Sequence, residues 1–172
     1  MSEHHRSEYR IAVVCWGNIC RSPMAEFVLR QALDEAGLGD RVTVSSAGTS
    51  TDELGRPMDR RTIAVMQRND VRDSGFRDKR ARQFRTDDFD GVDLVLAADH
   101  VHERILKDRA RHSEDATKIR LLRSFDPEAV AAGTLGMDDP WYGDDKDFDI
   151  TYAEIVTAAP HIVEHVRREL GE

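Results

Sequence analysis

Strand-like and helix-like patterns alternate along this chain of 172 residues, and the alternation predicts an α/β protein with a parallel sheet and helices on both of its faces. Four short segments are rich in β-branched and other apolar residues, as buried strands are. The length suits one domain with a sizeable core, and no repeat or low-complexity linker divides the chain. We therefore expect a flexible N-terminal tail, residues 1–9, followed by a single domain over residues 10–172.

The first strand is expected at residues 10–15, where the apolar run RIAVVC ends in a cysteine. The pattern then changes to helical spacing. Ser22 suits the N-cap of this helix, Pro23 its first helical position and Gly37 its C-terminal stop. A second strand is expected at residues 41–48, in the sequence RVTVSSAG.

The remaining elements continue the alternation. In chain order, we expect a helix, a strand, a helix and a strand at residues 59–70, 91–99, 101–110 and 118–125. Residues 126–149 are rich in Gly, Asp and Pro and should be irregular. Residues 150–170 have helical periodicity, but Pro160 lies inside them and should kink this segment or split it into two helices.

Composition limits the classes of partner. The formal net charge of −8 disfavours nucleic acid as the main partner. No apolar run approaches the ~18 residues of a membrane span, and the polar start MSEHHRSEYR lacks the apolar centre of a signal peptide. The seven histidines form no metal-ligand pattern. We therefore expect a cytoplasmic protein with no membrane anchor, no metal and no cofactor, and we favour a monomer.

The segment from Cys15 to Arg21, CWGNICR, joins the first strand to the first helix. A tight turn there can direct successive backbone N–H groups inward, and the helix start adds the positive end of its dipole. Gly17 and Asn18 tolerate the positive φ that such a turn needs. The planar guanidinium of Arg21 matches two oxygens of a tetrahedral oxyanion. The sequence therefore predicts a phosphate-binding loop with the thiol of Cys15 at its floor.

The chain has two cysteines, Cys15 and Cys20, and their spacing makes a poor disulfide framework. A helix start and a cationic neighbour both favour the thiolate form of Cys15 at neutral pH. A thiolate below a bound phosphate is placed for in-line attack on phosphorus. A chemical role for Cys15 is therefore the better interpretation.

The stretch VCWGNICRSPMAE closely resembles the signature of the low-molecular-weight protein tyrosine phosphatases. The resemblance continues, in the family's order and over nearly the whole chain, through SSAGTS (45–50), ARQF (81–84) and DDPWYGDDKDF (138–148). It implies a four-stranded parallel sheet with the phosphate-binding loop after the first strand, a phosphocysteine intermediate and no metal. It makes Cys15 the nucleophile, Arg21 the phosphate-binding residue and Asp139, before Pro140, the general acid and base.

The same resemblance assigns further roles around the loop, whose members after the nucleophile are Trp16, Gly17, Asn18, Ile19, Cys20 and, beyond Arg21, Ser22. Asn18, Ser22 and Ser46 match positions that hold the loop by hydrogen bonds, although Ser46 could also be a plain strand-end hydroxyl. Cys20 is either a partner for a reversible disulfide with Cys15 or a packed thiol, and both interpretations stay open.

The sequence departs from the family pattern in two places. Lys79 stands where several members carry a histidine that supports the loop asparagine, and lysine has no acceptor to offer. Trp16 follows the nucleophile where small or aliphatic residues are common, and Asp52 occupies a place often held by tryptophan. Together with Trp141 and Tyr142, Trp16 and Asp52 are expected to line a deep pocket that selects phosphotyrosine over phosphoserine.

The leading hypothesis is thus a phosphatase acting on tyrosine-phosphorylated proteins. An arsenate reductase of related fold would need relay cysteines outside the loop, which this chain lacks. A phosphoarginine phosphatase of the same fold tends to have threonine where Ile19 stands. A non-catalytic phosphotyrosine-binding module is disfavoured by the presence of Cys15, Arg21 and Asp139.

Overall fold

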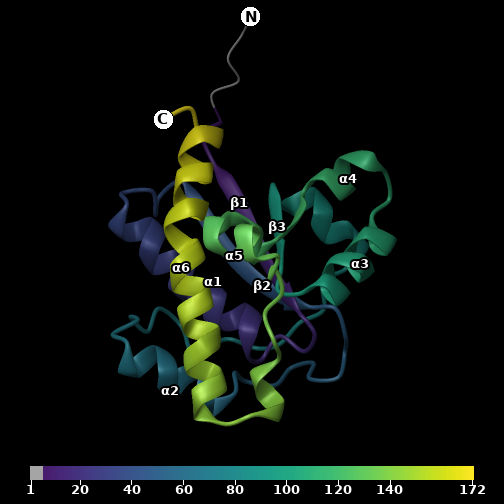
Figure 1. The fold of residues 1–172 in the computed structure, drawn as a ribbon. Coiled ribbons are helices and arrows are strands. Elements are labelled where there is room, and N and C mark those ends of the chain that lie inside the picture. The colour runs from purple at the N-terminus through teal and green to yellow at the C-terminus, as the bar shows by residue number, and fades with distance from the viewer. Residues whose placement is uncertain (1–5) are drawn as a thin grey trace, which may run out of the picture.

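Four parallel strands form the centre of the protein, in the spatial order β2–β1–β3–β4 (Figure 1). This computed structural model describes residues 6–172. The strands are β1 (Tyr9–Cys15), β2 (Val42–Gly48), β3 (Leu94–Ala97) and β4 (Ile119–Leu121). The predicted four-stranded parallel sheet is confirmed.

The sheet already includes Tyr9, so this residue does not belong to the N-terminal tail expected at residues 1–9. Tyr9 is the first residue of β1 and pairs with Val42, and its buried side chain hydrogen-bonds to His165 at 3.2 Å. Residues 1–5 lie outside the described part of the chain, so the flexibility expected there stays a prediction.

Alternate side chains of β1 enter two separate cores. Ile11 and Val13 pack with α1 (Arg21–Glu35), α2 (Arg60–Arg68) and α6 (Asp145–Glu169), whereas Ala12 and Val14 pack with Phe89 and Leu106 on the other face. That second face is covered by the 3₁₀ helix η1 (Thr86–Gly91), α3 (His100–Arg109) and α4 (Ser113–Thr117). Figure 1 shows α1, α2 and α6 on one side of the sheet and α3 and α4 on the other. A strand buried on both faces explains the unbroken apolar run at its position in the sequence.

The order of the strands creates a switch point beside β1. The chain leaves β1 through α1 to β2 on one side, and later enters β3 on the other side. In open parallel sheets the crevice beyond the strand ends at such a point is where ligands bind. Cys15, the last residue of β1, lies at this crevice.

Helix α1 begins at Arg21, so the expected cap at Ser22 and first helical position at Pro23 are wrong. Cys20 is the N-cap residue and its side chain makes no capping hydrogen bond. Ser22 lies inside the first turn because its hydroxyl is engaged by the loop, as described below. The C-terminal stop is as predicted: Gly37 has φ +78°, and Leu38 N–H donates to the Leu33 carbonyl at 2.9 Å.

The C-terminal part of the chain is more regular than expected. Only Ile119–Leu121 of the predicted strand 118–125 pair in the sheet, and Leu122–Phe125 form the 3₁₀ helix η2. The segment 126–149 contains α5 (Pro127–Ala132), the 3₁₀ helix η3 (Pro140–Tyr142) and the start of α6. A capping box at Asp144 and Asp147 begins α6 before its apolar periodicity does.

Helix α6 runs unbroken through Pro160, so the predicted split into two helices is wrong (Figure 1). Pro160 is exposed, while Ile155, Ala159 and Ile162 are buried against the core. Proline has no N–H to donate to the backbone carbonyl one turn earlier, but on the exposed side of the helix this carbonyl can bind water. Packing of the opposite, buried face against the core holds the helix together.

Replacing Pro160 by Ala should raise the free energy of unfolding by about 2–3 kcal/mol, because the ~3 kcal/mol helix penalty of proline exceeds the ~0.4–1 kcal/mol by which proline restricts the unfolded chain. Urea denaturation measures the change. His161→Ala, at the exposed neighbouring position, is the matched control and should move the midpoint little. An unchanged or lower stability of Pro160→Ala would show that proline is not a defect in this helix.

Candidate active site

The thiol of Cys15 lies at the floor of a loop formed by the residues that follow it. Its Sγ accepts a hydrogen bond from the backbone N–H of Asn18 at 3.3 Å and lies 3.0 Å from Ser22 Oγ. The side chain is 3% exposed. The sulfur therefore lies beside a backbone N–H and a hydroxyl at the start of α1, where the positive end of the helix dipole points.

Close contact with β2 shapes this loop. Asn18 has φ +63°, which asparagine tolerates better than other residues with a Cβ, and the sequence anticipated this. The carbonyls of Cys15 and Trp16 accept from the N–H groups of Thr49 and Ser50 at 2.8 and 3.0 Å. Gly48 lies so near the loop that a Cβ there would stand 2.6 Å from the Trp16 carbonyl oxygen. Only glycine fits at this crossing.

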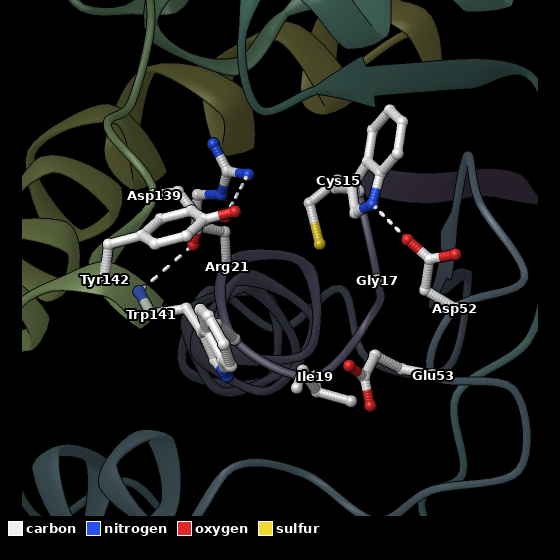
Figure 2. Close-up of a pocket in the computed structure, with 11 residues that line it drawn as sticks. Cys15, Gly17, Ile19, Arg21, Asp52, Glu53, Asp139, Trp141 and Tyr142 are labelled. Atoms are coloured by element: carbon white, nitrogen blue, oxygen red, sulfur yellow. Dashed lines mark hydrogen bonds and ion pairs between the residues drawn. The ribbon is translucent and has the colours of Figure 1, made fainter.

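Arg21 is buried, 4% exposed, and faces the opening above Cys15 (Figure 2). Its Nη1 donates to the Met137 carbonyl at 2.8 Å, and its Nη2 lies 3.5 Å from Asp139 Oδ2. Its Nε has no hydrogen-bond partner among the described residues. A buried donor without a partner is costly, and an oxyanion in the loop would supply one.

Of the neighbouring acids Asp138 and Asp139, only Asp139 lines the pocket. Its Oδ1 accepts from the Trp141 N–H at 3.1 Å, which makes it the N-cap of η3. Asp138 is exposed. Of the two acids, Asp139 is therefore the one whose carboxylate faces the pocket.

The pocket is walled by aromatic and acidic side chains from three parts of the chain. Figure 2 shows Asp139, Trp141 and Tyr142 on one side of the opening, Ile19 below it, and Asp52 and Glu53 on the other side. Its lining residues are Cys15, Trp16, Gly17, Ile19, Cys20, Arg21, Asp52, Glu53, Asp139, Trp141 and Tyr142. Every predicted loop and wall residue is present except Asn18 and Ser22, which lie buried behind the loop.

Trp16 and Asp52 are joined directly, which the sequence did not indicate. The indole Nε1 of Trp16 donates to Asp52 Oδ2 at 2.8 Å (Figure 2). Glu53, beside Asp52 in the same turn, was missed, although its place next to a predicted wall residue was a usable signal. The two carboxylates give the rim on this side a negative charge.

Asn18 has other partners in place of the histidine that Lys79 replaces. Its Oδ1 accepts from the backbone N–H of Arg82 at 3.1 Å, and its Nδ2 donates to Ser22 Oγ at 2.8 Å and Ser46 Oγ at 2.9 Å. Two serine hydroxyls thus accept from the Asn18 amide and one backbone N–H donates to it, so its support does not depend on a histidine. Lys79 instead bonds to the Ser46 carbonyl at 3.0 Å and to Glu26 at 3.3 Å.

Cys20 is buried in the core beneath the loop. Burial, followed by the nearby charge of Asp59, raises the pKa of its thiol well above the ordinary range. Cys20 is thus a neutral thiol at physiological pH, unlike a nucleophile. Whether it also traps an oxidised Cys15 stays a hypothesis.

Arg61 is a second residue that sequence reasoning missed. From α2 it donates to the carbonyls of Trp141 and Gly143 at 3.3 and 3.2 Å, and it pairs with Asp59 at 3.0 Å. The Asp59 N–H in turn donates to the Ile19 carbonyl at 2.9 Å. The segment 59–61 therefore ties the phosphate-binding loop to the loop that carries the acid.

Two further findings concern residues 6–172. No three His, Cys, Asp or Glu side chains there come together as metal ligands would. Within the same range, no helix combines the length and the apolar composition that a membrane span requires.

A parallel α/β domain with a buried cysteine under an anion-binding loop, closed by an arginine and faced by a carboxylic acid, defines a cysteine-dependent phosphatase. Residues 10–172 match the model of the low molecular weight phosphotyrosine protein phosphatases. The chain therefore belongs to this family.

Similar proteins agree with this assignment. A low molecular weight protein-tyrosine-phosphatase of Streptomyces coelicolor is 44% identical over 163 residues, which cover 94% of this chain and 96% of the relative. The low molecular weight protein-tyrosine phosphatase A of Mycobacterium tuberculosis is 40% identical over 162 residues, covering 94% and 93%. A solved protein tyrosine phosphatase of Entamoeba histolytica, with Hepes in its active site, superposes with a TM-score of 0.84 at 27% identity, covering 95% and 99%.

Replacing Gly48 by Ala should lower kcat/KM on p-nitrophenyl phosphate roughly tenfold to a hundredfold, the range for a displacement of about 1 Å in a reacting geometry. The new methyl group meets backbone of the loop, which must move to accept it. Steady-state kinetics measure the loss. Gly91→Ala, where a Cβ meets nothing within 4 Å, is the control. Equal kinetics of both variants with wild type would mean that the loop tolerates the shift.

Proposed function

We propose that this protein removes the phosphate group from phosphotyrosine side chains of protein substrates through a phosphocysteine intermediate on Cys15. The observation that carries the proposal is the pairing of a buried thiol with a buried guanidinium that lacks one partner. Cys15 and Arg21 line the same pocket, and Arg21 Nε is unpaired within the described residues. A phosphate dianion would complete the hydrogen bonding of Arg21 and of the loop N–H groups.

In the first step, the Cys15 thiolate attacks phosphorus and the bond from phosphorus to the phenolic oxygen breaks. Asp139 donates its proton to that oxygen, so that tyrosine leaves as a neutral phenol. Arg21 binds two oxygens of the transferring group and stabilises the charge that spreads over them. The products of this step are tyrosine and the phosphocysteine.

In the second step, Asp139, now a carboxylate, takes a proton from water while the water oxygen attacks phosphorus. The sulfur–phosphorus bond breaks, the thiolate of Cys15 is restored and inorganic phosphate leaves. Every step uses side chains of this protein and water, so we propose that the reaction is independent of metal.

The walls support an aromatic substrate. Trp16, Trp141 and Tyr142 surround the opening, and Ile19 lies at its edge. A phenyl ring can pack on these surfaces, whereas the short side chain of phosphoserine leaves them empty. Asp52 and Glu53 on the rim should repel acidic residues near the phosphotyrosine, so we propose a preference for basic or neutral flanking sequences.

The setting of the protein follows from the same chemistry. A nucleophilic thiolate needs a reducing compartment, and we therefore propose that the protein acts in the cytoplasm. Its partners would be tyrosine-phosphorylated proteins in signalling, bound one at a time by a monomer.

Replacing Asp139 by Ala should lower kcat on phenyl phosphates roughly 10²–10⁴-fold, the usual contribution of acid–base assistance. The loss should shrink with leaving groups such as p-nitrophenol, which need less protonation. Comparing kcat along a series of leaving groups measures this dependence.

Asp138→Ala is the matched control, because its carboxylate lies outside the pocket. A larger loss in Asp138→Ala would move the acid to that residue. Cys15→Ser should be inactive with every leaving group while still binding inorganic phosphate, and activity near the wild-type level in that variant would refute the covalent mechanism itself.

Replacing Trp16 by Ala should lower kcat/KM on aryl phosphates about 2- to 12-fold more than on alkyl phosphates, since an aromatic contact is worth ~0.5–1.5 kcal/mol beyond burial. Asp52→Ala, which removes the acceptor of the indole N–H, should give part of this loss. The aryl-to-alkyl ratio of kcat/KM measures both. A ratio equal to that of wild type would remove Trp16 from the substrate wall and leave it as a support of the loop.

A further inference from the structure

The peptide group that joins Gly136 to Met137, shortly before Asp139, is hydrogen-bonded on both of its sides. The Gly136 carbonyl accepts from Arg123 Nη1 at 2.8 Å, and the Met137 N–H donates to the Ala98 carbonyl at 2.9 Å. Because the atoms of a peptide group lie in one plane, bonds to its C=O and to its N–H together fix its orientation. The loop therefore approaches Asp139 in a defined direction.

The next carbonyl of the loop faces the substrate pocket. The Met137 carbonyl accepts from Arg21 Nη1 at 2.8 Å, and Arg21 Nη2 lies 3.5 Å from Asp139 Oδ2. Two consecutive carbonyls of this loop are thus each bound by an arginine. Arg21 lines the pocket, whereas Arg123 does not. Arg123 therefore holds the loop from outside the pocket.

Arg123 is itself held by a carboxylate of another helix. It lies in η2, and its Nη1, which donates to Gly136, also lies 3.0 Å from Oε2 of Glu154 in α6. The two side chains are 17% and 16% exposed. Burial raises the pKa of Glu154, and the charge of Arg123 opposes this rise. The pair therefore connects η2 and α6 to the loop that carries the acid.

Stability alone gives little reason for an arginine at this position. Arg123 Nε is buried and has no hydrogen-bond partner among the described residues. A buried donor without a partner destabilises a fold, and apolar side chains often replace a buried ion pair without loss of stability. An apolar side chain could not, however, donate to the Gly136 carbonyl. The feature that requires Arg123 is thus its bond to the loop.

We propose that Arg123 is a positioning residue for the general acid: through the Gly136 carbonyl it fixes the loop that carries Asp139, and Glu154 holds its guanidinium in place. Neither Arg123 nor Glu154 lines the pocket, so both act through the loop. The inference rests on the proposed function in one respect, that Asp139 is the general acid.

The experiment is Arg123→Met, which keeps a long side chain but removes every donor. The kcat/KM values for phenyl phosphate and p-nitrophenyl phosphate are compared. A displaced acid should slow phenyl phosphate roughly tenfold to a hundredfold, the range for a misplacement of about 1 Å. p-Nitrophenyl phosphate should lose less, because its leaving group needs less protonation. An equal loss on both substrates would indicate general damage to the fold and would overturn the proposal.

The matched control is Arg120→Met, in β4. The Arg120 guanidinium stacks on Phe125 of η2, 4.0 Å from the ring centroid, and lies outside the pocket. This change removes a packing contact of η2 but leaves the bond to Gly136 in place. The ratio of the two kcat/KM values should therefore stay at the wild-type value. A ratio shifted as in Arg123→Met would mean that any disturbance of η2 has this effect, against the proposal.

A double substitution shows whether the effect of Arg123 passes through the acid. In Asp139→Ala the position of the loop has lost its catalytic consequence. Adding Arg123→Met should then change kcat/KM on phenyl phosphate by no more than about twofold, the usual scatter between independent changes. An equal loss with and without Asp139 would show that Arg123 acts by another route.

Glu154→Gln covers the case in which Arg123→Met does not fold, as thermal unfolding would reveal. Glutamine offers Arg123 a neutral acceptor in place of a charged one, so a smaller loss of about two- to fivefold is expected, again larger for phenyl phosphate. Kinetics equal to those of wild type would contradict the proposal.

The single variant Asp139→Ala separates this inference from the proposed function. If its loss does not depend on the leaving group, Asp139 is not the general acid, and the proposed function and the inference both fail. If Asp139→Ala shows that dependence and Arg123→Met keeps the wild-type ratio of kcat/KM values, the positioning role alone is refuted.

Discussion

The site depends on one constraint: a negatively charged sulfur, and then a phosphate, must be held inside the protein at the end of its central strand. A buried anion is tolerated only where donors and positive charge surround it. The backbone N–H of Asn18, the start of α1 and the buried Arg21 meet this need around Cys15. The shape of this loop depends on the close approach of Gly48, the positive φ of Asn18 and the hydrogen bonds of the buried serines.

The second half of the site must meet the first from far away in the sequence. The Met137 carbonyl, 116 positions from Arg21, accepts from its guanidinium, and the Met137 N–H donates to the Ala98 carbonyl at 2.9 Å. Arg61 holds the other end of this loop by donating a hydrogen bond to the Trp141 carbonyl. The loop that carries the acid is therefore held by the residue after β3 on one side and by α2 on the other, which limits its movement away from the nucleophile.

The buried polar groups beneath the loop contribute more to a single, well-defined arrangement of side chains than to stability. Replacing a buried ion pair by apolar groups is often neutral or stabilising, so the pairing of Glu26 with Arg30 and Lys79 is weak evidence for stability. A fully bonded network does, however, select one arrangement of its hydroxyl and amide groups. That selection includes Ser22, whose hydroxyl accepts from Asn18 at 2.8 Å and lies 3.0 Å from the sulfur of Cys15.

The sequence by itself determined the elements and the chemistry of the loop, because strand and helix periodicity, Gly37 and the segment Cys15–Arg21 act through neighbours in the chain. Tertiary contacts decided the rest. Ser22 does not cap the helix because its hydroxyl is engaged by Asn18 and lies against the sulfur of Cys15. Pro160 stayed helical because its face is exposed. Asn18, Lys79 and Arg61 all contact residues that are distant in the sequence. Local sequence patterns do not indicate such contacts.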